Sequence, residues 1–123
     1  MPDVVPEAVD REELVRACRT AAGDSLRSVT YLSRESYEQV YLRADLSRDA
    51  DLQSFVEAER EGFAARTAYA GSELGDYRFT IRAFEAGYVT RVLDDGDGVF
   101  VTMDGAPLAR FREVATAVEG VLP

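Results

Sequence analysis

The sequence predicts an α+β domain: one five-stranded antiparallel sheet with three helices on its faces, in the order α-β-β-α-β-β-β-α. Three observations predict it. Residues 77–103 form three short runs of β-branched and aromatic residues separated by turns that contain Gly and Asp. Residues 26–42 alternate on either side of a polar turn, as a hairpin does. Three further stretches repeat apolar residues at helical spacing, within residues 10–22, 50–66 and 104–122.

The chain of 123 residues is short enough for one domain, which we expect to span residues 10–123. Residues 1–9 contain two prolines and no periodicity, and are predicted to be a flexible lead-in. The first helix is expected to begin after Asp10, whose carboxylate can cap the amide of Glu13. Gly23 is expected to end it in a left-handed conformation. Cys18, in the middle of the apolar stripe, is interpreted as a small buried residue rather than a reactive thiol.

The hairpin is predicted from Leu26 to Leu32 and from Tyr37 to Leu42, although the second run also contains good helix formers and could begin a helix. A helix over about residues 50–66 follows, with Ser47 or Asp49 as its N-cap. Glu59 falls within the apolar stripe of this helix, and a carboxylate buried there needs a partner. The stripe consists of Leu52, Phe55, Val56 and Phe63.

The three-stranded meander is expected to turn first at Glu85-Ala86-Gly87, a three-residue loop with Gly87 in the left-handed position. In that register Arg82 faces Thr90. One face of the sheet then carries Phe79, Ile81, Ala83, Val89, Arg91 and Leu93, and the other carries Thr80, Arg82, Phe84, Tyr88, Thr90 and Val92. The second turn is Asp94 to Gly98, and the last helix follows Pro107.

The charge composition is unusual. The net charge is −9, and all 14 basic residues are Arg, with no Lys. Genomic GC bias could favour Arg, but a salt-saturated cytoplasm explains the excess of carboxylates as well, because molar salt screens their repulsion. We therefore expect a halophile's protein. The arginines are dispersed, so a nucleic-acid partner is not expected.

The sequence lacks the residues that several kinds of catalytic and binding chemistry require. Without His or Lys the sequence offers no imidazole base, Schiff-base lysine or phosphate-binding lysine. The acidic turn Asp94 to Gly98 lacks the spacing of a calcium loop. We expect no enzyme, no cofactor and no metal. No apolar run is long enough to span a membrane and no signal peptide is evident, so a cytoplasmic location is expected.

The order of elements from Asp10 to Leu122 resembles the roadblock/profilin-like fold. In addition, residues 23–31 and 72–77 are similar to a family of small uncharacterised haloarchaeal proteins. The resemblance implies that the first and last helices share one face of the sheet and that the middle helix covers the other. The chain departs from that fold in the long, Gly-containing segment from Thr67 to Gly75, where the third strand should follow the middle helix closely.

The resemblance also implies a function: a protein-interaction or regulatory module that forms a homodimer, with a protein partner such as a small GTPase. A first alternative is a small-ligand sensor of PAS or profilin-like type, with a pocket lined by Phe79, Tyr88 and Phe100. A second is an enzyme that relies on carboxylates. With the middle helix over the sheet face of Arg82, we predict a Glu59–Arg82 ion pair, with Arg91 as the second choice; alternatively, Glu59 lies at the solvent edge.

Overall fold

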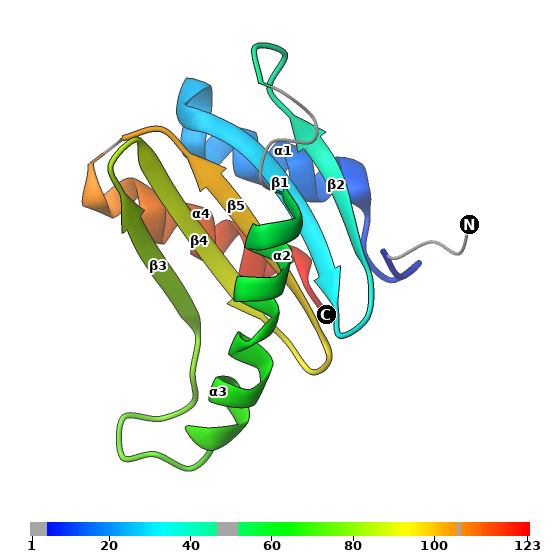
Figure 1. Ribbon diagram of the computed structural model, residues 1–123, viewed down its shortest axis with the longest axis vertical. Helices are drawn as coiled ribbons and strands as arrows, with labels where there is room; N and C mark the ends of the chain where they lie inside the picture. The colour runs from blue at the N-terminus through cyan, green and yellow to red at the C-terminus, as the bar shows by residue number, and fades with distance from the viewer. Residues whose placement is uncertain (1–4, 47–51, 106) are drawn as a thin grey trace.

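The computed structural model describes residues 5–46, 52–105 and 107–123 (Figure 1). Its five strands form one antiparallel sheet in the order β2-β1-β5-β4-β3, which confirms the predicted fold class. The second run of the hairpin is therefore a strand and not the start of a helix. The strands are β1 (Leu26–Ser33), β2 (Tyr37–Leu42), β3 (Phe79–Phe84), β4 (Gly87–Leu93) and β5 (Asp97–Met103).

The helices cover both faces of the sheet. Helices α1 (Arg11–Ala22) and α4 (Leu108–Val121) lie together behind it, while α2 (Leu52–Arg60) and α3 (Gly62–Ala68) cross in front (Figure 1). The middle helix predicted over residues 50–66 is thus divided at Glu61, and its proposed N-caps, Ser47 and Asp49, lie outside the described residues. None of the described helices is long and apolar enough to cross a bilayer.

The start and end of α1 follow from local chemistry. The carboxylate of Asp10 accepts a hydrogen bond from the Glu13 amide at 3.1 Å, which satisfies one of the free donors of the first turn. Gly23 ends the helix at φ 60°, a conformation that favours glycine. Cys18 is fully buried, and burial raises the pKa of its thiol to about 12, so it packs as a core residue and is not a nucleophile at neutral pH.

Part of the segment predicted to be a flexible lead-in packs against the domain. In its described part, Val5 and Val9 are only 4% exposed and belong to the core beneath α1 and α4. A turn in which the amide of Val9 donates to the carbonyl of Pro6 brings the two valines to the same side. The physical reason is the burial of apolar surface, which the absence of helical or strand periodicity could not reveal.

The sheet separates two apolar cores. The larger lies against α1 and α4 and includes Leu14, Tyr31, Val101 and Phe111. The smaller lies against α2 and α3 and consists of Leu32, Val56, Phe63, Val89, Leu93 and Phe100, with Leu52, Phe55 and Tyr77 packed at its margin. We call this second side of the sheet the α2 face.

The predicted register of the first meander hairpin is wrong by one residue. Phe84 pairs with Gly87 and Arg82 with Val89, so the turn contains only Glu85 and Ala86. Gly87 does not adopt a positive φ; it is needed because a Cβ there would lie 2.5 Å from the carbonyl oxygen of Met103 on β5. A slip of one residue moves every β4 side chain to the opposite face. Val89, Arg91 and Leu93 therefore share the α2 face with Thr80 and Arg82.

Candidate functional site

A cluster of charged side chains is buried beneath the junction of α2 and α3. The Glu59 carboxylate is 1% exposed and lies between two arginines of the sheet. Nη1 of Arg91 donates to its Oε1 at 3.0 Å, and Nε of Arg82 donates to its Oε2 at 3.1 Å. We call Glu59, Arg82 and Arg91 the charged cluster. The structure brings the predicted pair, Glu59 and Arg82, together and adds Arg91 to it.

The two arginines differ in their surroundings. The side chain of Arg91 is 4% exposed, whereas that of Arg82, on the outer strand β3, is 45% exposed. Arg91 also donates to the carbonyl oxygen of Glu59 at 3.4 Å, where α2 approaches its end, and to the hydroxyl of Thr80 at 2.9 Å. A cation suits the carbonyl end of a helix, so Arg91 helps to terminate α2.

Gly62 makes room for the Arg91 guanidinium. A Cβ at residue 62 would lie 2.4 Å from Cζ of Arg91, so only glycine permits the helix to rest on this group. The ring of Tyr77 lies on another side, 5.9 Å from Cζ. Neither residue was predicted from the sequence; the signal for Gly62 was a glycine within a helical pattern, which is unfavourable unless packing requires it.

An apolar cavity of about 240 Å³ lies on the same face, at the end where α2 begins. Of the residues predicted to line a pocket, Phe100 and Tyr88 border it, but the Tyr88 ring packs against Phe111 of α4 with centroids 4.2 Å apart. Phe79 does not border it, because it packs into the core beneath α1 and α4. Strand alternation places Phe79 and Phe100 on opposite faces of the sheet, so the two do not line one cavity. Other lining residues include Arg27, Ser28, Gln39, Leu42, Leu46, Leu52, Phe55, Phe84, Ala86 and Thr102.

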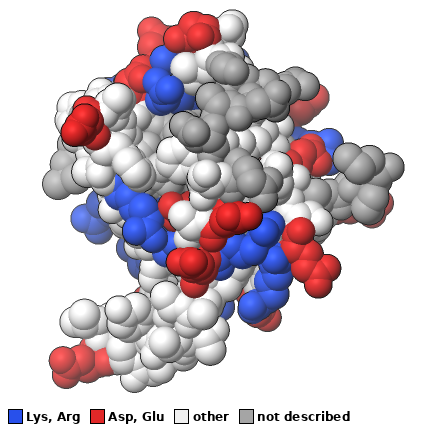
Figure 2. Space-filling view, viewed as in Figure 1, with Lys and Arg blue, Asp and Glu red and all other residues white. Residues whose placement is uncertain are grey.

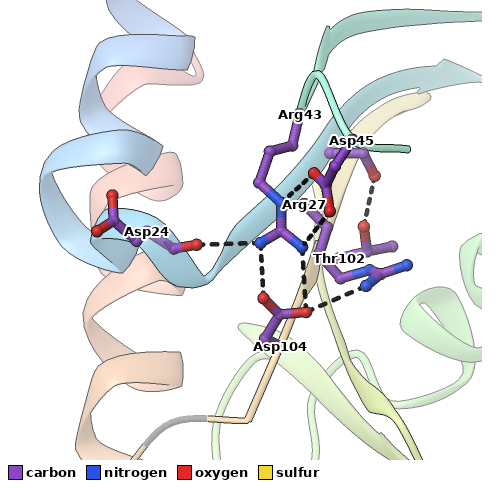
Figure 3. Close-up of polar contacts among 7 residues, drawn as sticks. Asp24, Arg27, Arg43, Asp45, Thr102 and Asp104 are labelled. Carbon is purple, nitrogen blue, oxygen red and sulfur yellow. Dashed lines mark hydrogen bonds and ion pairs between the residues drawn. The ribbon is translucent and has the colours of Figure 1, made fainter.

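A network of ion pairs includes Arg27, one of the residues that line the cavity (Figure 3). The Asp104 carboxylate, at the end of β5, accepts from Arg27 at 3.0 Å and from Arg43 at 2.6 Å. Arg43 also donates to Asp45 at 2.7 Å and to the main-chain carbonyl of Asp24 at 3.0 Å. These contacts join the ends of β1, β2 and β5 and fix the Arg27 side chain at the cavity.

Asp104 gives the network a pH dependence. The hydrogen bond from Arg43, followed by that from Arg27, lowers the pKa of Asp104 below its ordinary value, despite the opposing effect of burial. Because the folded-state pKa is depressed, the stabilisation is present above the unfolded pKa of about 4 and is lost as the pH falls through the folded pKa.

We expect Asp104→Asn to reduce the free energy of unfolding at pH 7 and to flatten its decline below about pH 4. Urea unfolding across this range measures both effects. Asp24→Asn is the matched control, since Arg43 contacts the Asp24 main-chain carbonyl, which the change leaves in place. An unchanged acid profile in Asp104→Asn would contradict the assignment.

A loop that follows α3 projects from the other end of the α2 face. We call residues 69–78 the arm. Figure 2 shows the protruding end of this face as mostly uncharged surface, whereas both signs of charge crowd its middle. Leu74 is 94% exposed and Tyr69 is 60% exposed. The segment forms no strand, although a short strand near Tyr69 was an open possibility.

Strand β3 forms one margin of the sheet, so its outer main-chain groups have no strand partner in the described part of the chain. Phe84, the last residue of this strand, is 50% exposed. Its ring meets that of Phe55 on α2 edge-on, with centroids 5.9 Å apart. An open strand margin beside an exposed aromatic residue is a common place for protein contacts.

The fold is similar to that of solved roadblock/LC7 and MglB structures. The solved structure of gliding protein MglB from Thermus thermophilus is 12% identical in sequence to this chain and matches it with a TM-score of 0.61. The match covers 95% of this chain and 92% of the MglB chain. A roadblock/LC7 domain from Streptomyces avermitilis is 14% identical to this chain and matches it with a TM-score of 0.55. That match covers 86% of this chain and 92% of the Streptomyces chain. A structure of MglB with a tetrameric arrangement is 14% identical to this chain and matches it with a TM-score of 0.57. That match covers 96% of this chain and 95% of the MglB chain.

Sequence comparison identifies the family itself. Residues 12–123 match the domain of unknown function DUF7522, and the chain belongs to that family. No curated protein matches the chain. Identities of 12–14% to the solved structures show a shared fold, so the function must be argued from the chain's own surfaces.

Proposed function

We propose that this chain is a non-enzymatic protein-interaction or regulatory module of a halophile cytoplasm, with a protein partner such as a small GTPase. The observation that carries the proposal is the open margin of β3 beside the half-exposed ring of Phe84. The fold shared with MglB and with a roadblock/LC7 domain supports it. Beneath this surface, the charged cluster joins α2 to β3 and β4.

The proposal is tested by capturing the tagged protein from its native lysate at molar KCl and identifying bound proteins by mass spectrometry. We expect a reproducible partner that Phe84→Glu removes, because a charge would have to be buried at the contact. Tyr37→Glu, on the opposite margin of the sheet, is the matched control. Equal recovery with both variants would contradict this surface.

A small-ligand sensor is the second candidate, favoured by the cavity of about 240 Å³ between α2 and the sheet. Mass spectrometry of the intact protein under native conditions distinguishes the two. A stoichiometric small molecule that Phe100→Trp displaces by filling the cavity would support the sensor. Protein capture without such a molecule would support the interaction module.

The halophile assignment is supported by the net charge of −9 and the absence of Lys. Carboxylate repulsion is weak at molar salt, where the Debye length is about 3 Å, and grows when salt is removed. We expect the protein to lose structure on dialysis against dilute buffer. A full circular dichroism spectrum without added salt would contradict the assignment.

A further inference from the structure

The charged cluster contains more positive than negative charge. Glu59 supplies one carboxylate to two arginines, so the cluster carries one net positive charge in a chain whose net charge is −9. Arg82 donates to that carboxylate only through Nε, at 3.3 and 3.1 Å from the two oxygens. Within the described part of the chain, its Nη1 and Nη2 donate to no protein group. Since this side chain is 45% exposed, it can bind a second carboxylate from outside the chain.

Arg82 and Phe84 present a charged and an apolar group together on the open margin of the sheet. They alternate with Ala83 along β3, so both side chains lie on the α2 face, where Arg82 contacts Glu59 and Phe84 contacts Phe55. The described part of the chain places no strand outside β3 (Figure 1). An added strand would therefore meet both side chains on the same face.

We propose that β3 binds an extended acidic segment of a partner protein, which adds a further strand to the sheet. A carboxylate of that segment contacts the unused nitrogens of Arg82, and an apolar side chain two residues away covers Phe84. Main-chain hydrogen bonds along the margin provide affinity, and alternate side chains provide specificity, as in other cases of strand addition. This assignment rests on the proposed interaction function and names the chemistry of the partner at that surface.

The spacing of the two partner residues follows from the geometry of a sheet. Side chains directly opposite each other on neighbouring strands have Cβ atoms about 4.5–5.5 Å apart, which lets a carboxylate reach a guanidinium. Residues i and i+2 of a strand share one face, so the residues that meet Arg82 and Phe84 are also two positions apart. In an antiparallel segment the apolar residue comes first and Asp or Glu second, and a parallel segment reverses this order.

A second copy of β3 does not supply this pattern. The strand Phe79–Phe84 contains one arginine and no carboxylate, so pairing two copies along it gives Arg82 no acidic partner from that strand. Molar salt does not remove the preference for a carboxylate. A directly hydrogen-bonded ion pair, at about 2.8 Å, lies within the Debye length of about 3 Å at that salt concentration. The charge at the margin therefore selects an acidic segment of a different protein.

Selection from a displayed library of random peptides in molar KCl tests the proposal. We expect the wild-type chain to enrich sequences with Asp or Glu two positions from an apolar residue. Arg82→Gln is expected to lose the preference for a carboxylate, and Arg78→Gln is expected to keep it. Arg78 is the matched control because it lies one residue before β3, yet its guanidinium pairs with Glu119 of α4 at 2.7 Å. Circular dichroism verifies that both variants are folded.

Titration calorimetry with the most enriched peptide measures the contact directly. Replacing its carboxylate by the amide is expected to raise the Kd about 10-fold for the wild-type chain, as for other hydrogen bonds between charged groups. For Arg82→Gln the same replacement is expected to raise the Kd no more than about twofold, because the two groups act as a pair. Equal effects on both proteins would overturn the contact. Arg82 lies outside the cavity lining, whereas Phe84 borders it, so this result separates the strand margin from a ligand in the cavity.

Failure here is distinguishable from failure of the proposed function. No enrichment, enrichment without a carboxylate, or enrichment of sequences that resemble residues 79–84 would each overturn the acidic segment as occupant. A lysate partner that Phe84→Glu removes would survive that result, because it would bind the same surface through other chemistry. Loss of both the lysate partner and the peptide selection would overturn both proposals.

Discussion

Glu59→Gln is expected to lower the free energy of unfolding by about 3–5 kcal/mol, the usual effect of breaking a buried ion pair by removing one partner. The change leaves the Arg91 guanidinium, 4% exposed, without a carboxylate. The neutral amide keeps the size of the side chain, so the loss of stability measures the removal of the charge and not the creation of a cavity. Urea unfolding at constant high salt, followed by circular dichroism, measures the change.

The matched control is Glu61→Gln, the same chemical change two residues along, at an exposed position. It is expected to change stability by no more than about 0.5 kcal/mol. Arg82→Gln tests the other half of the cluster. Because the Arg82 side chain is 45% exposed, we expect a loss of at most about 1 kcal/mol. If Glu59→Gln were as mild as Glu61→Gln, the buried pair would not contribute as described.

Replacing both charges separates the pair from its packing. Glu59→Leu/Arg91→Leu removes the carboxylate and the guanidinium together, and apolar replacements of buried ion pairs are often neutral or stabilising. We expect the double variant to be more stable than Glu59→Leu alone. Double-mutant-cycle analysis gives the coupling free energy between the two positions. A coupling near zero would show that the two side chains act independently.

Gly62→Ala is expected to destabilise the protein by about 1–3 kcal/mol, even though alanine is the better helix former. The new methyl group would lie 2.4 Å from Cζ and Nη1 of Arg91. That guanidinium cannot move aside freely, because it donates to Glu59 and Thr80. Thermal unfolding compared with wild type measures the effect.

The same substitution elsewhere in the chain is the control. Gly120 lies within α4, where a Cβ would meet no atom within 4 Å. Gly120→Ala is therefore expected to stabilise the protein by up to about 1 kcal/mol, as helix propensity alone predicts. We therefore expect the free energy of unfolding to fall with Gly62→Ala and to rise with Gly120→Ala. Stabilisation by Gly62→Ala would contradict the close approach of Arg91.

Patterns within single elements predicted much of this structure. The Asp10 cap, the Gly23 terminus and the order of strands and helices follow from local chemistry and periodicity, and the structure confirms them. The local sequence pattern also singled out Glu59, because helical spacing placed a carboxylate within an apolar stripe. Its neighbourhood depended on which face each strand presents, and the sequence alone could not determine that.

The turn between β3 and β4 determines which face each side chain of β4 occupies. A loop of two residues or of three at Glu85-Ala86-Gly87 is equally compatible with the sequence, but the two choices put Arg91 on opposite faces. The deciding contact is between Gly87 and the main chain of Met103, which lies on a different strand. Likewise, the division of the middle helix at Glu61 depends on Arg91, 30 residues away. Such long-range contacts leave no periodic signal.

The position of β5 has a consequence for the order of folding during synthesis. This strand is the last of the five to be made, yet it lies in the middle of the sheet, between β1 and β4. Until it leaves the ribosome, the two hairpins β1–β2 and β3–β4 have no shared neighbour, and β1 and β4 expose inner margins. Non-local pairing of this kind is slow. The sheet is therefore completed only after β5 has been synthesised, and until then the nascent chain is exposed to misassembly.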